Sequence, residues 1–279
     1  MVEVCDGTID YKQFRLECNK WGNPSATVCV NDNNNAVGWR WSNNGGWTYP
    51  DIYVGTNFCN RPSTWSVFPI KWGDVTSWKI DLAWEYIENP TGEYNLAFDI
   101  YFSDVCNVPS GISDSSKKMN PMIWLQAGGD LAYGVSGLPL VSDGYNQYYS
   151  EDIPQPWPRK IFHLKDYING NGSATIDVKK LCDTISGLSS NWILTDIFLG
   201  NENTGGNGTG SGNIKITKYD IEINGQIISL DGTGGSGGGS GVSWFDRTTC
   251  ITPTLCIPNK YMAIGVGGLF LMMMTMMKK

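Results

Sequence analysis

Hydrophobic and polar residues alternate with a period of two along several stretches of this 279-residue chain. Such alternation is typical of β-strands that bury one face and expose the other. The predicted strands are Trp78–Ile87, Tyr94–Phe102, Met122–Gln126 and Ile214–Ile223. Turn-forming pairs follow them, namely Asn89-Pro90, Gly128-Gly129 and Asn224-Gly225. The chain is therefore predicted to consist mainly of strands.

One helix is predicted, over Val178–Ser186. Asp177 precedes it as an N-cap residue, and Gly187 follows it as the residue that ends the helix in a left-handed conformation. Many strands with one short helix indicate an all-β fold. We expect a β-jelly-roll sandwich of two antiparallel sheets, curved enough to leave a concave groove.

Three parts follow one another along the chain. Residues 1–231 are predicted to form the jelly-roll domain, and residues 232–249 a Gly/Ser-rich linker. The tail, 250–279, contains an uncharged apolar run over 261–277, which is at the short end for a membrane-spanning helix. We expect a C-terminal hydrophobic helix that anchors the protein in a membrane. The alternative is a terminal helix that packs against a partner protein.

The composition favours a saccharide-binding protein over a nucleic-acid-binding one. The chain has 12 Trp and 13 Tyr, and aromatic side chains are what sugar rings stack on. Its formal net charge is −7 and no basic cluster is visible, so nucleic acid is not expected as a partner.

The eight cysteines include no Cys-x-x-Cys pair, and the chain has one histidine. No metal site and no cofactor is therefore predicted. An even number of cysteines predicts several disulfides and an extracellular or surface-exposed protein, the alternative being reduced, buried thiols. The first twenty residues contain no apolar segment of the signal-peptide kind, so we expect no ordinary signal peptide there.

Several short motifs carry a resemblance to a known family. The segment Asn120-Pro121-Met122-Ile123-Trp124-Leu125 resembles the strand of family 12 glycoside hydrolases that begins with the catalytic glutamate and continues to Met, Ile or Val, Trp and Leu. Further matches run in family order, and these are Asn19–Gly22, Tyr49–Gly55, Tyr94–Asp99, Leu199–Glu202 and Lys218–Asn224. The resemblance spans residues 5–224 and implies a retaining endo-β-1,4-glucanase or xyloglucanase.

The resemblance assigns site residues one by one. Glu202 matches the acid/base, Asp99 the supporting carboxylate, and Asn120 the nucleophile, which is glutamate in the family. Retaining hydrolysis needs two carboxyl groups about 5–5.5 Å apart, one of which attacks the sugar. An amide is a poor nucleophile, and Pro121 also removes a backbone donor from this strand. Hydrolysis is therefore predicted to be lost or strongly impaired.

The resemblance also implies where sugar binds and which cysteines pair. The family uses the positions of Asn19, Trp21, Met122 and Trp124 for substrate binding. Cys5 and Cys29 fall where fungal members place an N-terminal disulfide.

We therefore expect a membrane-tethered protein that binds β-glucan or xyloglucan and has lost hydrolysis. Two alternatives stay open. One is an active endo-β-1,4-glucanase or xyloglucanase with a rearranged site. The other is a structural surface or capsid-type protein that reuses the jelly roll as a building block.

Overall fold

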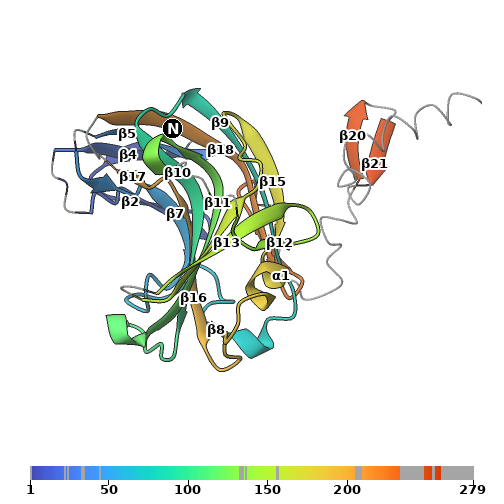
Figure 1. Ribbon diagram of the computed structural model, residues 1–279. Coiled ribbons are helices and arrows are strands. Elements are labelled where there is room, and N and C mark those ends of the chain that lie inside the picture. The colour runs from blue at the N-terminus through green and yellow to red at the C-terminus, as the bar shows by residue number, and fades with distance from the viewer. Residues whose placement is uncertain are drawn as a thin grey trace, which may run out of the picture. The chain divides into compact units, whose positions relative to one another are not determined.

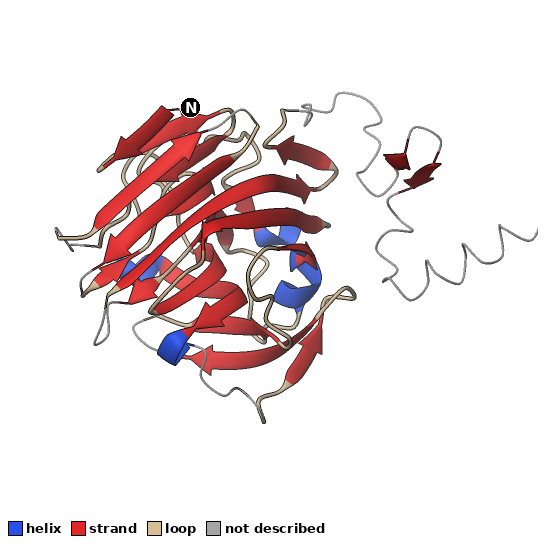
Figure 2. Cartoon of the chain, turned by 90° about the horizontal axis from the view of Figure 1, so that it is seen from above, coloured by secondary structure: helices blue, strands red, loops and turns tan. Residues whose placement is uncertain are grey.

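A computed structural model describes residues 2–232 with short gaps at 22, 24, 33–34, 44, 132–134, 136, 155–156 and 205–208, together with 248–252 and 255–258. The chain divides into two compact units, Met1–Gly234 and Gly235–Lys279. In the first unit two curved sheets pack face to face (Figure 1). Strands make up most of this unit and are joined by loops and short helical segments (Figure 2).

The first sheet has seven strands in the order β1-β4-β5-β18-β9-β15, with β19 paired to β18. Their bounds are β1 Val2–Cys5, β4 Thr27–Asp32, β5 Val37–Asn43, β18 Gly210–Ile223, β9 Trp78–Glu88, β15 Gly172–Asp177 and β19 Gln226–Ser229.

The second sheet has twelve strands, whose main path is β12-β13-β14-β11-β10-β16-β7-β3-β2. The bounds along this path are β12 Leu140–Ser142, β13 Gln147–Ile153, β14 Arg159–Leu164, β11 Lys117–Gly128, β10 Glu93–Ser103, β16 Ile193–Gly200, β7 Asp51–Gly55, β3 Phe14–Glu17 and β2 Thr8–Tyr11. The short strands β6 Trp47–Thr48, β8 Ile70–Lys71 and β17 Asn203–Thr204 lie off the path. The helical segments are α1 Val178–Asp183, η1 Trp72–Asp74, η2 Asp114–Ser116 and η3 Gly129–Leu131.

The alternation along β10 explains how this sheet separates core from site. Leu96, Phe98 and Ile100 belong to the large apolar cluster between the sheets. Asp99 and Tyr101, one residue out of phase, line a cavity on the other face. A period of two thus places a carboxylate on the sheet without placing it in the apolar core.

The all-β sandwich is as predicted, but one sheet is not purely antiparallel. Strand β11 pairs with β14 in parallel, with Asn120 opposite Arg159. The twelve-stranded sheet is therefore mixed. Alternating hydrophobicity carries no information on strand direction, so the sequence pattern could not distinguish the two arrangements.

Helix α1 begins as predicted and ends early. The Asp177 carboxylate accepts a hydrogen bond from Lys180 N. The helix ends at Asp183 because Thr184 N and Ile185 N bond to the carbonyls three residues back, which closes the last turn as a 3₁₀ turn.

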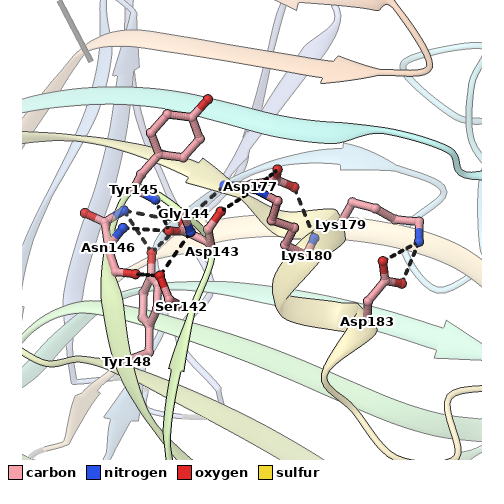
Figure 3. Close-up of polar contacts among 10 residues, drawn as sticks. All are labelled: Ser142, Asp143, Gly144, Tyr145, Asn146, Tyr148, Asp177, Lys179, Lys180 and Asp183. Carbon is pink, nitrogen blue, oxygen red and sulfur yellow. Dashed lines mark hydrogen bonds and ion pairs between the residues drawn. The ribbon is translucent and has the colours of Figure 1, made fainter. Parts of the chain in front are cut away.

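A buried carboxylate attaches the turn between β12 and β13 to the start of α1 (Figure 3). Asp143 Oδ1 accepts hydrogen bonds from Tyr145 N at 2.8 Å and Asn146 N at 2.6 Å. Its Oδ2 accepts from Asp177 N at 3.1 Å and from the Tyr148 hydroxyl at 3.2 Å. Asp143 is fully buried, so these bonds replace the water that its charge has lost.

Two disulfides cross-link the first unit. Cys5 bonds to Cys29, the pair that the family resemblance implies, and Cys59 bonds to Cys106. Disulfides are typical of proteins that fold in an oxidising compartment, which agrees with an extracellular location.

In the second unit the structure describes one hairpin, made by β20 Thr248–Thr252 and β21 Leu255–Pro258. The apolar run 261–277, predicted as a membrane helix, and most of the predicted linker 232–249 lie outside the described residues. Of the helices in the described ranges, none is long and apolar enough to cross a bilayer.

Candidate functional site

A cavity of about 540 Å³ lies on the twelve-stranded sheet. Its floor comes from three adjacent strands: Asp99 from β10, Asn120 and Met122 from β11, and Arg159 from β14. The remaining lining residues are Trp21, Trp47, Phe58, Tyr101, Lys117, Trp157 and Glu202. The three residues that the resemblance assigns to catalysis therefore share one cavity.

Asn120 is buried and its amide is held in place. Its Nδ2 donates to Asp99 Oδ1 at 3.1 Å and to the Ile100 carbonyl at 3.0 Å. The Asn120 backbone N–H donates to the Pro158 carbonyl at 2.9 Å, so the backbone at this point is also fixed. Asn120 therefore presents an uncharged donor that is bonded to the neighbouring carboxylate.

The two remaining carboxyl groups are both buried and affect one another. Burial raises the pKa of Asp99 above its ordinary value, and the hydrogen bond from Asn120 opposes this shift. Burial, and then the negative charge of Asp99, raise the pKa of Glu202 to about 7. A carboxyl with such a pKa holds its proton in mildly acidic solution, which suits it to be a proton donor.

An uncharged amide network holds Glu202. Asn95 Nδ2 donates to Glu202 Oε2 at 2.6 Å, and Glu202 N donates to Asn95 Oδ1 at 2.9 Å. The Asn95 carbonyl accepts from Asn201 Nδ2, and Asn201 Oδ1 accepts from Trp39 Nε1 at 2.7 Å. Asn203 Nδ2 in turn donates to the Asn201 carbonyl at 3.0 Å. Each member is buried, so the glutamate has a rigid support.

One end of the cavity is aromatic. Trp21 is half exposed and stacks on Tyr49, with ring centroids 5.5 Å apart, and lies 6.2 Å from the ring of Trp47. Trp21 adopts a positive φ, and its N–H donates to Asn19 Oδ1 at 3.2 Å. An exposed aromatic face of this kind is a surface on which a sugar ring can stack.

A second group of lining residues combines aromatic and basic side chains, since Lys117 lies over the rings of Phe58 and Trp157. Phe58 lies in a turn where three consecutive residues, 57–59, have positive φ. Such a backbone costs about 1–2 kcal/mol per residue. It is held by Asp196, whose carboxylate accepts from Asn57 N and Phe58 N at 2.5 and 2.8 Å, and by the disulfide of Cys59.

The structure does not bring every predicted residue to the cavity. Met122 and Trp21 line it, while Asn19 and Trp124 are not among the lining residues. Asn19 supports the aromatic end, because its carbonyl accepts from Tyr49 N at 2.7 Å. Trp124 is buried, with its ring edge-on to His163 at 5.0 Å. The roles of Asn19 and Trp124 in sugar binding stay predictions.

Other lining residues carried no signal in the sequence. Lys117 and Arg159 belong to runs of two basic residues, and one member of each run faces the cavity. Trp157 precedes a strand that the alternation did not reveal. Their contribution depends on strand pairing, which the local pattern does not specify.

No metal site is evident among the residues that the structure describes. The acidic and cysteine side chains with suitable spacing are Glu3, Cys5 and Cys29, but the two sulfurs form a disulfide and offer no thiolate.

Comparison of the sequence with protein-family models and with curated proteins finds no match. Solved structures match its fold. Endoglucanase Cel12A from Rhodothermus marinus is 20% identical with a TM-score of 0.66, over 80% of this chain and 99% of that one. A family 12 xyloglucanase from Bacillus licheniformis is 19% identical with a TM-score of 0.64, over 80% and 100%. A metagenome-derived family 12 endoglucanase is 19% identical with a TM-score of 0.66, over 80% and 97%. Over four fifths of its length, the chain thus has a jelly roll similar to that of family 12 glycoside hydrolases.

Proposed function

We propose that this protein binds β-1,4-glucan or xyloglucan in the cavity of its jelly roll and has lost most or all hydrolytic activity. The observation that carries the proposal is the amide of Asn120, buried beside Asp99 in the same cavity as Glu202. A retaining mechanism requires a carboxylate that attacks the anomeric carbon. The amide cannot supply the negative charge that this step needs.

The hydrogen bond between Asn120 and Asp99 supports the loss of activity. Asp99 Oδ1 is already an acceptor for the Asn120 amide, and Asp99 is buried on the sheet. This bond stabilises the charge of the Asp99 carboxylate, which makes it a weaker nucleophile in place of the missing one. The acid/base position, in contrast, is retained in Glu202 with its amide support.

Binding is supported by the aromatic end of the cavity. Trp21 and Trp47 are each close to half exposed, although both are large apolar side chains. Exposed aromatic rings beside a cavity are typical of saccharide-binding surfaces. A structure of the Bacillus licheniformis xyloglucanase contains a ligand, and its fold covers 80% of this chain. The tether to a membrane through 261–277 belongs to the same proposal and rests on the sequence pattern alone.

Reversion of the nucleophile position tests the proposal. The full chain is titrated with cello- and xyloglucan oligosaccharides by calorimetry, and products are analysed by chromatography. The wild type is expected to bind without cleaving. Asn120→Glu is expected to create or greatly raise hydrolysis, and Asn120→Gln, which has the same length without the charge, is the matched control.

Two results would contradict the proposal. The first is absence of binding to either class of oligosaccharide. The second is hydrolysis by the wild type that Glu202→Gln abolishes. The latter result would favour the second candidate, an active glucanase, which is supported by the presence of two carboxyl groups, Asp99 and Glu202, in one cavity.

A further inference from the structure

Two basic side chains line the cavity away from its exposed tryptophans. Lys117 pairs with Ser103 at one end of β10, whereas Trp47 pairs with β17, which pairs with the other end of β10. Lys117 begins β11 and Arg159 begins β14, and both line the cavity. The parallel pairing of these strands sets Arg159 directly opposite Asn120. The floor of the cavity therefore has a cation beside the uncharged residue that replaces the nucleophile.

Lys117 is directed into the cavity by aromatic rings. Its Nζ lies 4.2 Å from the ring centroid of Trp157 and 5.1 Å from that of Phe58. It also forms an ion pair with Asp114 at 2.9 Å, but the Asp114 side chain is 80% exposed. The Lys117 side chain is 16% exposed, so water screens this pair mainly from the Asp114 side, and another anion can replace Asp114 as a partner.

The charges that line the cavity include two cations and two carboxyl groups. Burial raises the pKa of Asp99 and Glu202, and the positive charge of Arg159 opposes this rise for both, so Arg159 acts on these carboxyl groups across the cavity. In mildly acidic solution the two carboxyl groups carry less negative charge than ordinary carboxylates, which favours an added anion beside Arg159 and Lys117. Asn120 contributes no charge. Lysine and arginine side chains are cationic in the same solution.

We propose that the cavity recognises an acidic glucan, a β-linked glucose polymer with carboxylate groups, and that Lys117 and Arg159 bind the carboxylate. This inference rests on the proposed glucan-binding function and specifies its substrate class. A neutral glucan can accept hydrogen bonds from the two cations but has no charge to pair with them, whereas a carboxylate binds arginine and lysine through stronger, charge-assisted hydrogen bonds. The protein as a whole has a formal charge of −7, so a preference for an anionic ligand must arise locally.

The test compares two probes of equal length, a neutral cello-oligosaccharide and its counterpart oxidised to the carboxylate at C6. Calorimetry on the full chain is expected to give about tenfold tighter binding of the acidic probe at low salt, the increment that one charge-assisted contact supplies. The advantage is expected to shrink as salt is added.

The neighbouring residues supply matched controls. Lys117→Met and Arg159→Met are expected to remove the preference for the acidic probe, with a smaller effect on the neutral one. Lys118→Met and Lys160→Met each remove one positive charge from the residue that follows Lys117 or Arg159. Neither Lys118 nor Lys160 lines the cavity, so these two variants are expected to keep the preference for the acidic probe.

Equal affinity of the wild type for the two probes would overturn the inference and leave the proposed function standing. So would a preference that Lys117→Met and Arg159→Met do not reduce. If neither probe binds, the proposed function itself fails.

Discussion

The protonation state of Glu202 is expected to make the folded protein less stable as the pH rises. The pKa of Glu202 is about 7 in the folded chain, because of burial and the charge of Asp99, against 4.5 as its ordinary value. Between these pH values the folded chain keeps the proton and the unfolded chain releases it. Stability from this group is therefore fully present below pH 4.5 and is lost as the pH rises through 7.

The size of the effect follows from these two values. Proton linkage makes Glu202 responsible for a loss of roughly 2–3 kcal/mol between pH 5 and pH 8. Glu202→Gln keeps an oxygen that can accept from Asn95 Nδ2 and carries no titratable proton. We expect this variant to lose roughly 2–3 kcal/mol less stability than the wild type over the same interval. Asp196, a buried acid with a raised pKa, is common to both proteins and cancels in the comparison, whereas the measured difference includes the effect of Glu202 on its neighbour Asp99.

The assay is urea unfolding of both proteins at pH 5 and pH 8, followed by tryptophan fluorescence. Glu88→Gln, which removes an exposed glutamate from β9, is the control and is expected to behave as the wild type. Parallel pH profiles for the wild type and Glu202→Gln would refute the reasoning, since they would mean that Glu202 is ionised in the folded protein at both pH values.

Two further predictions concern stability. Asp143→Ala deprives three backbone N–H groups and one tyrosine hydroxyl of their acceptor and is expected to cost about 4 kcal/mol in urea unfolding, whereas Asp143→Asn retains one acceptor oxygen and costs less. An equal loss in both variants would contradict this. Removing the Cys59–Cys106 disulfide by paired alanine substitution opens a loop with a sequence separation of 47 and is expected to cost about 4 kcal/mol. Because Cys59 follows Phe58, this variant is also expected to bind oligosaccharide more weakly, while the matched Cys5–Cys29 double variant keeps its affinity.

The class of fold could be predicted from the sequence. Successive residues of a strand face the core and the solvent in turn, so apolar and polar residues alternate along each strand. The sequence also predicted that Asp99, Asn120 and Glu202 belong together, through motifs in family order rather than through local chemistry. These motifs lie on β10, on its neighbour β11, and just beyond the end of β16, which pairs with β10 on its other side. Side chains on the same face of adjacent strands are neighbours. Matching the motifs to those of the family therefore also predicted that these three side chains lie close together.

The basic end of the cavity was not predictable in the same way. Arg159 reaches Asn120 through a parallel pairing between β11 and β14, and nothing in the local pattern specifies that partner. Phe58 reaches the cavity through a turn in which three consecutive residues have positive φ, and no turn motif in the sequence predicts this turn. Both features depend on contacts between segments distant in sequence.

The support beneath Glu202 consists of carboxamides and an indole, groups that neither gain nor lose a proton in ordinary buffers. An amide oxygen accepts and an amide nitrogen donates equally well in acid and in alkali. When the glutamate releases its proton, these amides and the indole therefore have no reason to rearrange. The side chain can change charge while staying at one place, so that ligand affinity would follow pH through electrostatics alone and not through movement of the protein.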